Sequence, residues 1–409
     1  MRWTITIVMF LVIEIYAYQA LKTAFKFNWI SKTYLLINFF VISVLLYRIL
    51  YIEYNSLSYT DQFYDYLSIP IAMVITLTVF KLIICLHLII EDLFRLIMFC
   101  VNKLNSNETD SWSIKRRSFI SKIGLFIASL PIPFVMYGIF KGRFDFRVIK
   151  YEIEFDDLPK EFDGYQITHI SDIHAGSLSN EKKIKYAIDL INNEGSELVL
   201  FTGDFVNSKS SELVKWKDIF SKIKSKDGKF SILGNHDYGD YVDWDSEDSK
   251  KNNFQNLLQI QKKMGFNVLL NENFKIQKGK SKIFIIGVEN WGKGGFRKSA
   301  DLEKACLGIN NLDFKIMMTH DPSHWDLKLR DHKINFNLTL SGHTHGMQFG
   351  IEIPGWIKWS PVQWVYKHWA GLYYEKHQYI NVNRGFGVLA FPGRVGISPE
   401  ISVIKLKKT

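Results

Sequence analysis

Side chains that can bind metal ions gather in five short clusters, and each cluster directly follows a short apolar segment. The clusters are Asp172-Ile173-His174, Gly203-Asp204, Gly234-Asn235-His236-Asp237, Thr319-His320 and Ser341-Gly342-His343-Thr344-His345. Carboxylates and imidazoles are the ligands of divalent metals such as Mn, Fe and Zn. Two such ions about 4 Å apart can hold the attacking and leaving oxygens of an in-line displacement at phosphorus. The clusters therefore predict a two-metal site for phosphoryl chemistry.

The apolar segments before the clusters have the length of strands, and segments with helical spacing separate the first of them. We expect strands near residues 165–171, 197–202, 229–233, 274–276, 281–287, 314–318, 334–340, 373–382 and 395–406. We expect helices near residues 181–192, 211–223 and 251–264. Strand–helix alternation followed by a strand-rich half predicts an α/β fold built around a sheet sandwich. In such folds, sites collect at the carboxyl ends of strands.

In this order, the five clusters resemble the motifs of the calcineurin-like metallophosphoesterase superfamily: Asp-x-His, Gly-Asp, Gly-Asn-His-Asp, His and Gly-His-x-His. All five motifs are present, over about residues 164–350. The resemblance implies a metallophosphoesterase-type β-sandwich flanked by helices. It also implies a hydrolase that cleaves phosphate esters with two divalent metal ions, whose identity among Mn, Fe and Zn is left open.

The resemblance further implies a role for each ligand. One metal would be held by Asp172, His174 and His345, the other by Asn235, His320 and His343, and Asp204 would bridge the two. A metal-bridging hydroxide is the implied nucleophile. His236 resembles the group that contacts the phosphoryl oxygen or protonates the leaving group, and we expect Asp237 to orient the His236 ring.

Two outer features narrow the resemblance. Residues 162–167 lead directly into the first cluster, and the tail carries Asn-Arg-Gly-Phe-Gly at 383–387, Pro-Gly-Arg at 392–394 and Pro-Glu-Ile at 399–401. They are similar to a bacterial membrane-associated branch that includes twin-arginine-exported phosphoesterases and lipid-precursor pyrophosphatases of the UDP-diacylglucosamine type. Arg384 and Arg394 could bind a substrate phosphate through their guanidinium forks. The alternative is that both are salt-bridged arginines at strand ends.

The first third of the chain differs in composition from the rest. A helix needs about 20 apolar residues to cross a bilayer. Four stretches qualify, at about residues 3–21, 34–54, 66–90 (continuing toward Cys100) and 119–140, the last interrupted by Pro131 and Pro133. We therefore expect an all-helical transmembrane module at 1–141, a connector with the first strand at 142–163, and the metallophosphoesterase domain at 164–409.

Basic residues set the expected orientation in the membrane. Lysines lie in the first loop (Lys22, Lys26, Lys32), whereas the second loop carries Asp61 and Asp65 and no Lys or Arg. The third loop is again basic and ends in Arg116-Arg117-Ser118-Phe119-Ile120-Ser121-Lys122, which is either a twin-arginine export signal or an ordinary basic flank. This pattern predicts a multi-pass protein of the cell membrane with its catalytic domain outside the cytoplasm.

The charge distribution agrees with a membrane protein. Residues 1–150 hold 16 Lys and Arg against 9 Asp and Glu, a net +7 of the chain's +10. The basic excess therefore flanks apolar segments, and no nucleic-acid partner is expected. Three cysteines, with only Cys306 beyond the apolar segments, give no disulfide framework and no cysteine metal motif.

The leading interpretation is a membrane-anchored hydrolase of phosphodiester or pyrophosphate bonds, whose substrate could be linked to a lipid. Two alternatives stay open: a lipid-precursor pyrophosphatase that faces the cytoplasm, and a membrane sensor or transporter regulated by the metal domain. A dense aromatic stretch follows the last cluster: Trp356, Trp359, Trp364, Tyr366 and Trp369. It would form either a bilayer-facing lip beside the metals or the packing of a C-terminal subdomain.

Overall fold

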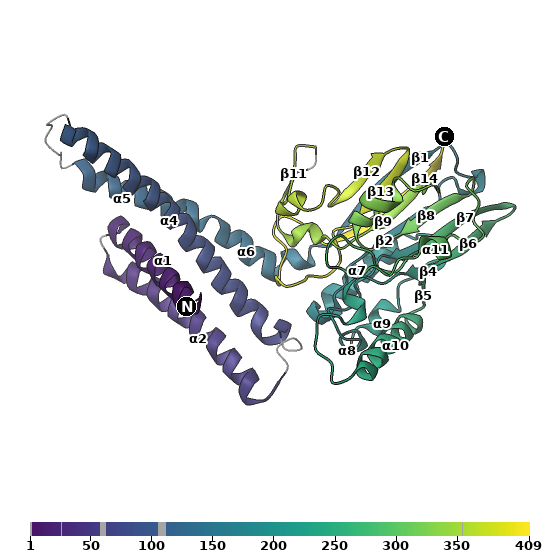
Figure 1. Cartoon of the computed structure of the whole chain (residues 1–409), viewed down its shortest axis with the longest axis horizontal. Coiled ribbons are helices and arrows are strands. Elements are labelled where there is room, and N and C mark those ends of the chain that lie inside the picture. Colours follow the sequence, from purple (N-terminus) through teal and green to yellow (C-terminus); the bar gives the residue numbers. More distant parts are fainter. Residues whose placement is uncertain (1, 26, 58–62, 105–111, 354) are drawn as a thin grey trace. The chain divides into compact units, whose positions relative to one another are not determined.

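The structure is a computed structural model that describes residues 2–25, 27–57, 63–104, 112–353 and 355–409. The side chains of residues 2–9, 65, 102, 104 and 112–116 are outside that description. The chain forms two compact units, Met1–Tyr137 and Gly138–Thr409. Figure 1 shows long helices in the first unit, and sheets with flanking helices in the second.

The first unit is all helical. Its elements are α1 (Arg2–Ala24), α2 (Asn28–Tyr54), the π-helix η1 (Phe63–Leu67), α4 (Ser68–Leu104), α5 (Trp112–Ser129) and α6 (Pro131–Phe140), the last of which runs into the second unit. Within the described residues, three helical segments are long and apolar enough to cross a membrane, namely Asn28–Tyr54, Ser68–Val101 and Arg117–Phe144. They coincide with the second, third and fourth expected spans. The first expected span, residues 3–21, falls in α1, where the side chains of residues 2–9 are not described.

Two details of the helical unit follow from single residues. The fourth expected span is divided between α5 and α6 at Pro131, since proline lacks the N–H that would continue a helix. Lys81, a charge inside the third expected span, lies 2.5 Å from a carboxylate oxygen of Glu14 on α1. Pairing with an opposite charge is the usual way to accommodate an ionised side chain among apolar helices.

The expected orientation in the membrane depends partly on residues outside the described part. Lys26, Asp61 and the loop segments 58–62 and 105–111 lie there, and so do the side chains of Asp65 and Arg116. The side of the membrane on which the metal clusters lie therefore stays a prediction.

The second unit contains two six-stranded sheets. The first sheet has the order β1-β14-β2-β3-β4-β5, with β1 (Arg147–Phe155), β2 (Gln166–Ile170), β3 (Leu198–Phe201), β4 (Gly228–Ser231), β5 (Phe266–Val268) and β14 (Glu400–Lys408). The second has the order β12-β13-β9-β8-β7-β6, with β6 (Glu272–Lys278), β7 (Ser281–Gly287), β8 (Phe314–Met318), β9 (Leu338–Ser341), β12 (Gly371–Glu375) and β13 (Gln378–Val382). A separate antiparallel ribbon pairs β10 (Ile351–Ile353) with β11 (Ile357–Trp359).

Helices and short turns connect the strands. The helices are α7 (Glu181–Asn193), α8 (Ser211–Val214), α9 (Lys217–Phe220), α10 (Glu247–Lys263), α11 (Leu302–Ala305) and α12 (Pro322–His324). The shorter helical turns are η2 (Gly142–Phe144), η3 (Lys160–Phe162), η4 (Ala175–Ser177), η5 (His236–Tyr238), η6 (Trp325–Leu329), η7 (His345–Gln348) and η8 (Pro361–Trp364).

Strand alternation builds the layers of this unit. On β3, Leu198 and Leu200 belong to one apolar cluster together with residues of the second sheet. The intervening Val199 and Phe201 belong to another cluster, together with residues of α7, α9 and α10. Because successive side chains of a strand point to opposite faces, the two sheets pack on each other, and helices cover the outer face of the first sheet. The expected sheet sandwich flanked by helices is confirmed.

Several elements differ from the expectation. The stretch expected as one strand over residues 373–382 is a hairpin, β12 and β13, and the helix expected over 211–223 is two four-residue helices, α8 and α9. The strands β5, β10 and β11 are only three residues long. Such short strands carry too few residues for a recognisable alternation.

Candidate metal centre

The five clusters lie at the carboxyl ends of five strands. In the first sheet β2, β3 and β4 are neighbours and parallel, and in the second sheet β8 and β9 are neighbours and parallel. Parallel neighbours end at the same edge, so the clusters that follow β2, β3 and β4 meet one another. The sandwich brings the clusters after β8 and β9 to the same place. Two groups of potential ligands result, Asp172 with His174 and His345, and Asp204 with His320 and His343.

The first group is fully buried and compact. His345 Nε2 lies 3.2 Å from Asp172 Oδ1 and 3.0 Å from His174 Nε2. The Asp172 carboxylate also accepts the backbone N–H of His343 at 3.0 Å from Oδ2, which links this group to the second. The three potential metal-ligand atoms of this group therefore converge on one point.

The second group is fixed by hydrogen bonds behind it. His320 Nδ1 donates to the Thr202 carbonyl at 2.7 Å, which leaves Nε2 as the ring nitrogen that can bind a metal. That Nε2 lies 3.1 Å from Asp204 Oδ2 and 3.2 Å from His343 Nδ1. The same Asp204 oxygen lies 3.6 Å from His174 Nε2 of the first group. One carboxylate oxygen thus faces both groups.

Asn235, which comes from the third cluster, has an unusual amide. Its Nδ2 donates to the Tyr241 hydroxyl at 2.8 Å, whereas its buried Oδ1 has no hydrogen-bond partner among the described residues. A buried amide oxygen left in this way costs free energy unless something else binds it. A cation is a suitable partner, because amide oxygens ligate hard divalent ions.

The backbone of the ligand residues is strained. The φ angles of Asp172, His174, Asp204, His343 and His345 are 53°, 46°, 62°, 69° and 51°. This left-handed region costs an L-residue on the order of 1 kcal/mol, and clusters of such residues mark functional sites. Five strained residues, all of them predicted ligands, show that the fold holds these side chains in place against local preference.

The electrostatics of the buried groups are those of a cation site. Burial alone would raise the pKa of Asp204, but the facing histidines, His320 first, hold it well below its usual range. Burial alone would lower the pKa of His320, but Asp204 overcomes it and raises the value to about 10. Burial lowers the pKa of His174 well below its usual value. At neutral pH His174 is therefore neutral, as a metal ligand must be, whereas His320 is protonated and paired with the ionised Asp204. A bound cation would take the place of that proton, because metal binding releases protons from its ligands.

Two families of known proteins match parts of this chain. Residues 165–347 match the family described as calcineurin-like phosphoesterase, and residues 1–143 match the family described as probable calcineurin-like phosphoesterase, transmembrane domain. The metallophosphoesterase YkuE of Bacillus subtilis (strain 168) is 31% identical, over 62% of this chain and 82% of its own length. The chain belongs to the calcineurin-like metallophosphoesterase family.

Other relatives are also named as metallophosphoesterases, and one of them as a transmembrane protein. A transmembrane protein with metallophosphoesterase domain from Danio rerio is 25% identical, over 79% of this chain and 72% of its own length. A metallophosphoesterase of Aquifex aeolicus (strain VF5) is 26% identical, over 64% of this chain and 92% of its own length. The chain is therefore a membrane protein and a metal-dependent phosphoesterase, as the motifs and the apolar segments predicted.

His236 and Asp237 of this metallophosphoesterase make separate contacts in the structure. His236 Nδ1 donates to the Asn207 carbonyl at 2.7 Å, so its Nε2 is the nitrogen that remains for a ligand. Asp237 does not orient His236, contrary to the expectation. Its carboxylate accepts four backbone N–H groups, those of Asp204, Phe205, Val206 and Gly234 at 2.8–3.3 Å. The sequence could not distinguish the two arrangements, because the acceptor that holds His236 is a backbone carbonyl.

The guanidinium group of Arg384 is not available to bind a phosphate. It is buried and ion-paired with Glu400 and Glu352, and these partners raise its pKa despite burial. The expected alternative, a salt-bridged arginine at a strand end, describes it correctly.

Arg394 is also buried. Its guanidinium donates to the carbonyls of Gly385 and Gly387, at 3.1 Å and 2.6 Å from Nη2. The same Nη2 lies 3.4 Å from His345 Nδ1. Burial lowers the pKa of Arg394 to about 9. Arg394 therefore lies behind a predicted ligand and supports the loop 385–387, instead of facing a substrate phosphate.

Two residues that sequence reasoning did not assign to the site contact His343. The Tyr366 hydroxyl lies 2.9 Å from His343 Nε2, and Asp321 Oδ2 lies 3.4 Å from the same nitrogen. Since His343 Nδ1 faces the ligand group, Tyr366 and Asp321 hold the ring from behind. The proximity of Asp321 to His320 in the sequence was the only available signal.

Glu212 is a third residue that sequence reasoning missed. Its carboxylate accepts the backbone N–H groups of Gly176, Asn207, Ser208 and Lys209 at 2.6–3.1 Å. Burial raises its pKa even so. Glu212 thus ties the loop after β2 to the segment whose carbonyl, that of Asn207, holds His236.

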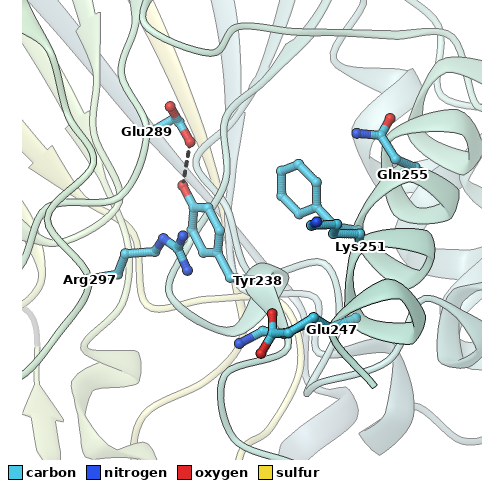
Figure 2. A pocket seen from close by; sticks show the side chains of 8 residues that line it. Tyr238, Glu247, Lys251, Gln255, Glu289 and Arg297 are labelled. Carbon is cyan, nitrogen blue, oxygen red and sulfur yellow. Dashed lines mark hydrogen bonds between the residues drawn. The ribbon is translucent and has the colours of Figure 1, made fainter. Parts of the chain in front are cut away.

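A pocket of about 360 Å³ opens next to the third cluster. Figure 2 shows Tyr238, which directly follows Asp237, between Arg297 and the helix that carries Lys251 and Gln255. The Tyr238 hydroxyl donates to Glu289 at 3.1 Å, and the Arg297 guanidinium lies 4.3 Å from the centre of the Tyr238 ring. The pocket is lined by side chains of both charge signs, among them Glu247, Glu289, Lys251 and Arg297.

Proposed function

We propose that this chain is a membrane-anchored two-metal hydrolase of phosphodiester or pyrophosphate bonds. The observation that carries the proposal is the position of Asp204 Oδ2, which lies 3.6 Å from His174 Nε2 and 3.1 Å from His320 Nε2. A carboxylate that faces two ligand groups at once can bridge two cations. Phosphoryl transfer with two cations about 4 Å apart is a well-supported mechanism.

The ligand atoms fit divalent cations. One ion would be held by Asp172, His174 and His345, a second by Asn235, His320 and His343, with Asp204 between them. Mixed oxygen and imidazole donors suit Mn, Fe or Zn. The bare Oδ1 of Asn235 supports its inclusion, since it has no hydrogen-bond partner among the residues described.

Bound cations would supply an activated water at neutral pH and neutralise charge on the phosphoryl group. The chain's own residues would do the remaining work. The carbonyl of Asn207 fixes the tautomer of His236, so that His236 Nε2 can contact a phosphoryl oxygen or protonate the leaving group. Asp237 holds the backbone turns after β3 and β4 together, which keeps Asp204 and Asn235 in place.

The activity test uses the full chain purified in detergent and loaded with Mn. We expect hydrolysis of a generic aryl phosphodiester, and we expect Asp204→Asn to lower kcat by at least a factor of 1000, because the bridging charge is lost. Asp189→Asn, on the helix α7, is a matched control that should leave kcat unchanged. Activity of the Asp204→Asn variant within tenfold of the parent would disprove the mechanism.

For the membrane we propose a multi-pass arrangement with the catalytic domain outside the cytoplasm. Basic residues in the first and third expected loops support it. A reporter that is active only outside the cytoplasm, fused after Thr409, should be active. An inactive fusion, together with an active cytoplasmic reporter at the same place, would favour a cytoplasm-facing enzyme such as a lipid-precursor pyrophosphatase.

A further inference from the structure

An exposed apolar surface lies beside the metal centre in the second unit. We call it the aromatic lip, and its members are Phe349, Ile351, Ile353, Trp356, Trp364 and Val365. The exposed fractions of Trp356, Trp364 and Val365 are 77%, 74% and 67%. Trp369, at the end of the same stretch, is buried in a small apolar cluster with Val362, and Tyr366 packs against that cluster. Internal packing therefore explains Tyr366 and Trp369 but not the exposed side chains of the lip, and an apolar patch of this kind usually marks an interaction surface.

The ribbon β10–β11 has an apolar face and a polar face. Its paired residues are Ile351 with Trp359, Glu352 with Lys358 and Ile353 with Ile357. Because side chains alternate along each strand, the two apolar pairs share one face and the charged pair occupies the other.

The polar face of the ribbon is turned toward the domain. Glu352 is ion-paired with the buried Arg384, and Lys358 donates to the Ala370 carbonyl. The apolar face therefore points away from the domain, where Ile351 and Ile353 are exposed. An antiparallel ribbon bordered by water normally has the opposite polarity. The polarity of this ribbon is the one expected where its outer face contacts an apolar neighbour.

Backbone contacts connect the ribbon to the end of the last apolar span. That span, Arg117–Phe144, includes the first residues of the second unit. Within the second unit, the Gly138 carbonyl accepts the N–H of Arg394 at 3.1 Å, and the Val395 N–H donates to Gln348 at 2.7 Å. Gly350, the residue before β10, donates back to the Val395 carbonyl at 2.9 Å. A Cβ on Gly138 would lie 2.7 Å from the Arg394 oxygen, so only glycine permits this approach.

The other side of the lip borders the metal centre. Trp364 and Val365 directly precede Tyr366, whose hydroxyl lies 2.9 Å from His343 Nε2. Ser360, between the ribbon and η8, donates at 2.8 Å to the carbonyl of Gly346, the residue after the last metal cluster. Hydrogen bonds thus connect the aromatic lip to the end of the span on one side and to the segment of the predicted ligands on the other.

We propose that the aromatic lip is a membrane-docking surface that rests in the interface of the bilayer crossed by the chain's own helices. Tryptophan and neighbouring aliphatic side chains favour that interface. The short connection to the span end keeps the lip within reach of the lipid. If the chain is the hydrolase proposed above, the position of the lip beside the metal centre also identifies the substrate class. The substrate is a phosphate ester carried by a lipid, which reaches the metal centre from the membrane surface.

Spin labels test the docking. The full chain with Cys100→Ser, which removes an exposed thiol and leaves the buried Cys85 and Cys306, is placed in nanodiscs of phosphatidylcholine and phosphatidylglycerol. One label replaces Trp356, and a control label replaces Tyr374, whose exposed fraction is 54% on β12. We expect the label at 356 to be reached by oxygen more than by a water-soluble nickel chelate, and the label at 374 to show the reverse.

Equal exposure of both labels to the nickel chelate would overturn the docking. Spin–spin broadening of the label at 356, which indicates a second copy of the chain on the lip, would overturn it as well. If Trp356→Cys fails to fold, Trp364→Cys places the label on the other half of the lip, with the same expected outcomes.

An activity ratio tests the substrate class. We compare kcat/KM for a phosphodiester embedded in vesicles with kcat/KM for a water-soluble aryl phosphodiester. Joint Trp356→Ala and Trp364→Ala replacement should lower the ratio of embedded to soluble substrate at least fivefold. An unchanged ratio would overturn the lipid-linked substrate. A parent chain inactive on both substrates would contradict the proposed function instead, whereas the spin labels report on docking independently.

Discussion

Tyr366→Phe is a perturbation with a specific expected effect on one of the two predicted metal sites. The hydroxyl of Tyr366 lies 2.9 Å from His343 Nε2, and His343 Nδ1 faces His320 and the second ligand group. Phenylalanine keeps the ring and removes only the hydroxyl. The imidazole then loses one of the two contacts that hold it from behind, while Asp321 remains at 3.4 Å.

The expected magnitude follows from that single contact. A hydrogen bond of this kind contributes about 1 kcal/mol, and 1.4 kcal/mol corresponds to a factor of about ten in an equilibrium constant. Loss of a residue that orients a metal ligand generally costs about 10- to 100-fold in affinity. Because Asp321 stays in place, we expect a value near the lower end, about tenfold, at the site that contains His343 and His320.

The assay is a Mn titration of the full chain, with binding followed by isothermal calorimetry and metal content checked after dialysis. We expect two binding steps, of which only one weakens in Tyr366→Phe. Tyr374→Phe removes a hydroxyl from an exposed tyrosine of β12 and should leave both steps unchanged. Equal weakening of both steps, or no change in either, would refute the assigned role of Tyr366.

Three further variants test other parts of the site. Asp237→Asn turns an amide N–H₂ toward backbone N–H donors, so we expect the free energy of unfolding to fall by about 3 kcal/mol, measured as a lower melting temperature, while every step of the pH–rate profile remains. Loss of a step at unchanged stability would instead indicate a direct role of the Asp237 carboxyl group in catalysis. Glu212→Ala frees the segment whose Asn207 carbonyl holds His236, the candidate acid, so kcat should fall about tenfold with little change in KM. Glu181→Ala, on the exposed start of α7, is the control, and a change confined to KM would contradict this role of Glu212. At Gly203, whose φ is 96°, an added Cβ would lie 2.4 Å from the Gly234 nitrogen. Gly203→Ala should therefore displace the turn before Asp204, and bound metal should be lost. Full metal content in this variant would show that the turn can move without harm to the site.

The metal-ligand clusters could be found from the sequence because they depend on short motifs at strand ends. The sheet topology then brings the clusters together, since the parallel neighbours β2, β3 and β4 place Asp172, Asp204 and Asn235 at one edge. The bounds of β7 and β8 also matched the expected segments, because each is a mainly apolar run between polar residues.

The roles of residues that act through the backbone could not be predicted this way. Asp237 and Glu212 each accept four N–H groups, and Arg394 donates to carbonyls. A backbone acceptor or donor carries no residue type, so no spacing in the sequence marks the contact. Tyr366 was read only as part of an aromatic stretch, because its distance from His343 depends on the fold of residues 344–365.

The shared position of Asp204 is the central claim, and magnetic coupling tests it most directly. The full chain is loaded with Mn(II) and studied by electron paramagnetic resonance. We predict the spectrum of an exchange-coupled Mn pair, and we predict that Asp204→Asn converts it to the spectrum of separate ions or lowers the metal content to one ion per chain. Uncoupled Mn in the parent at full loading would contradict a carboxylate bridge between the two ligand groups.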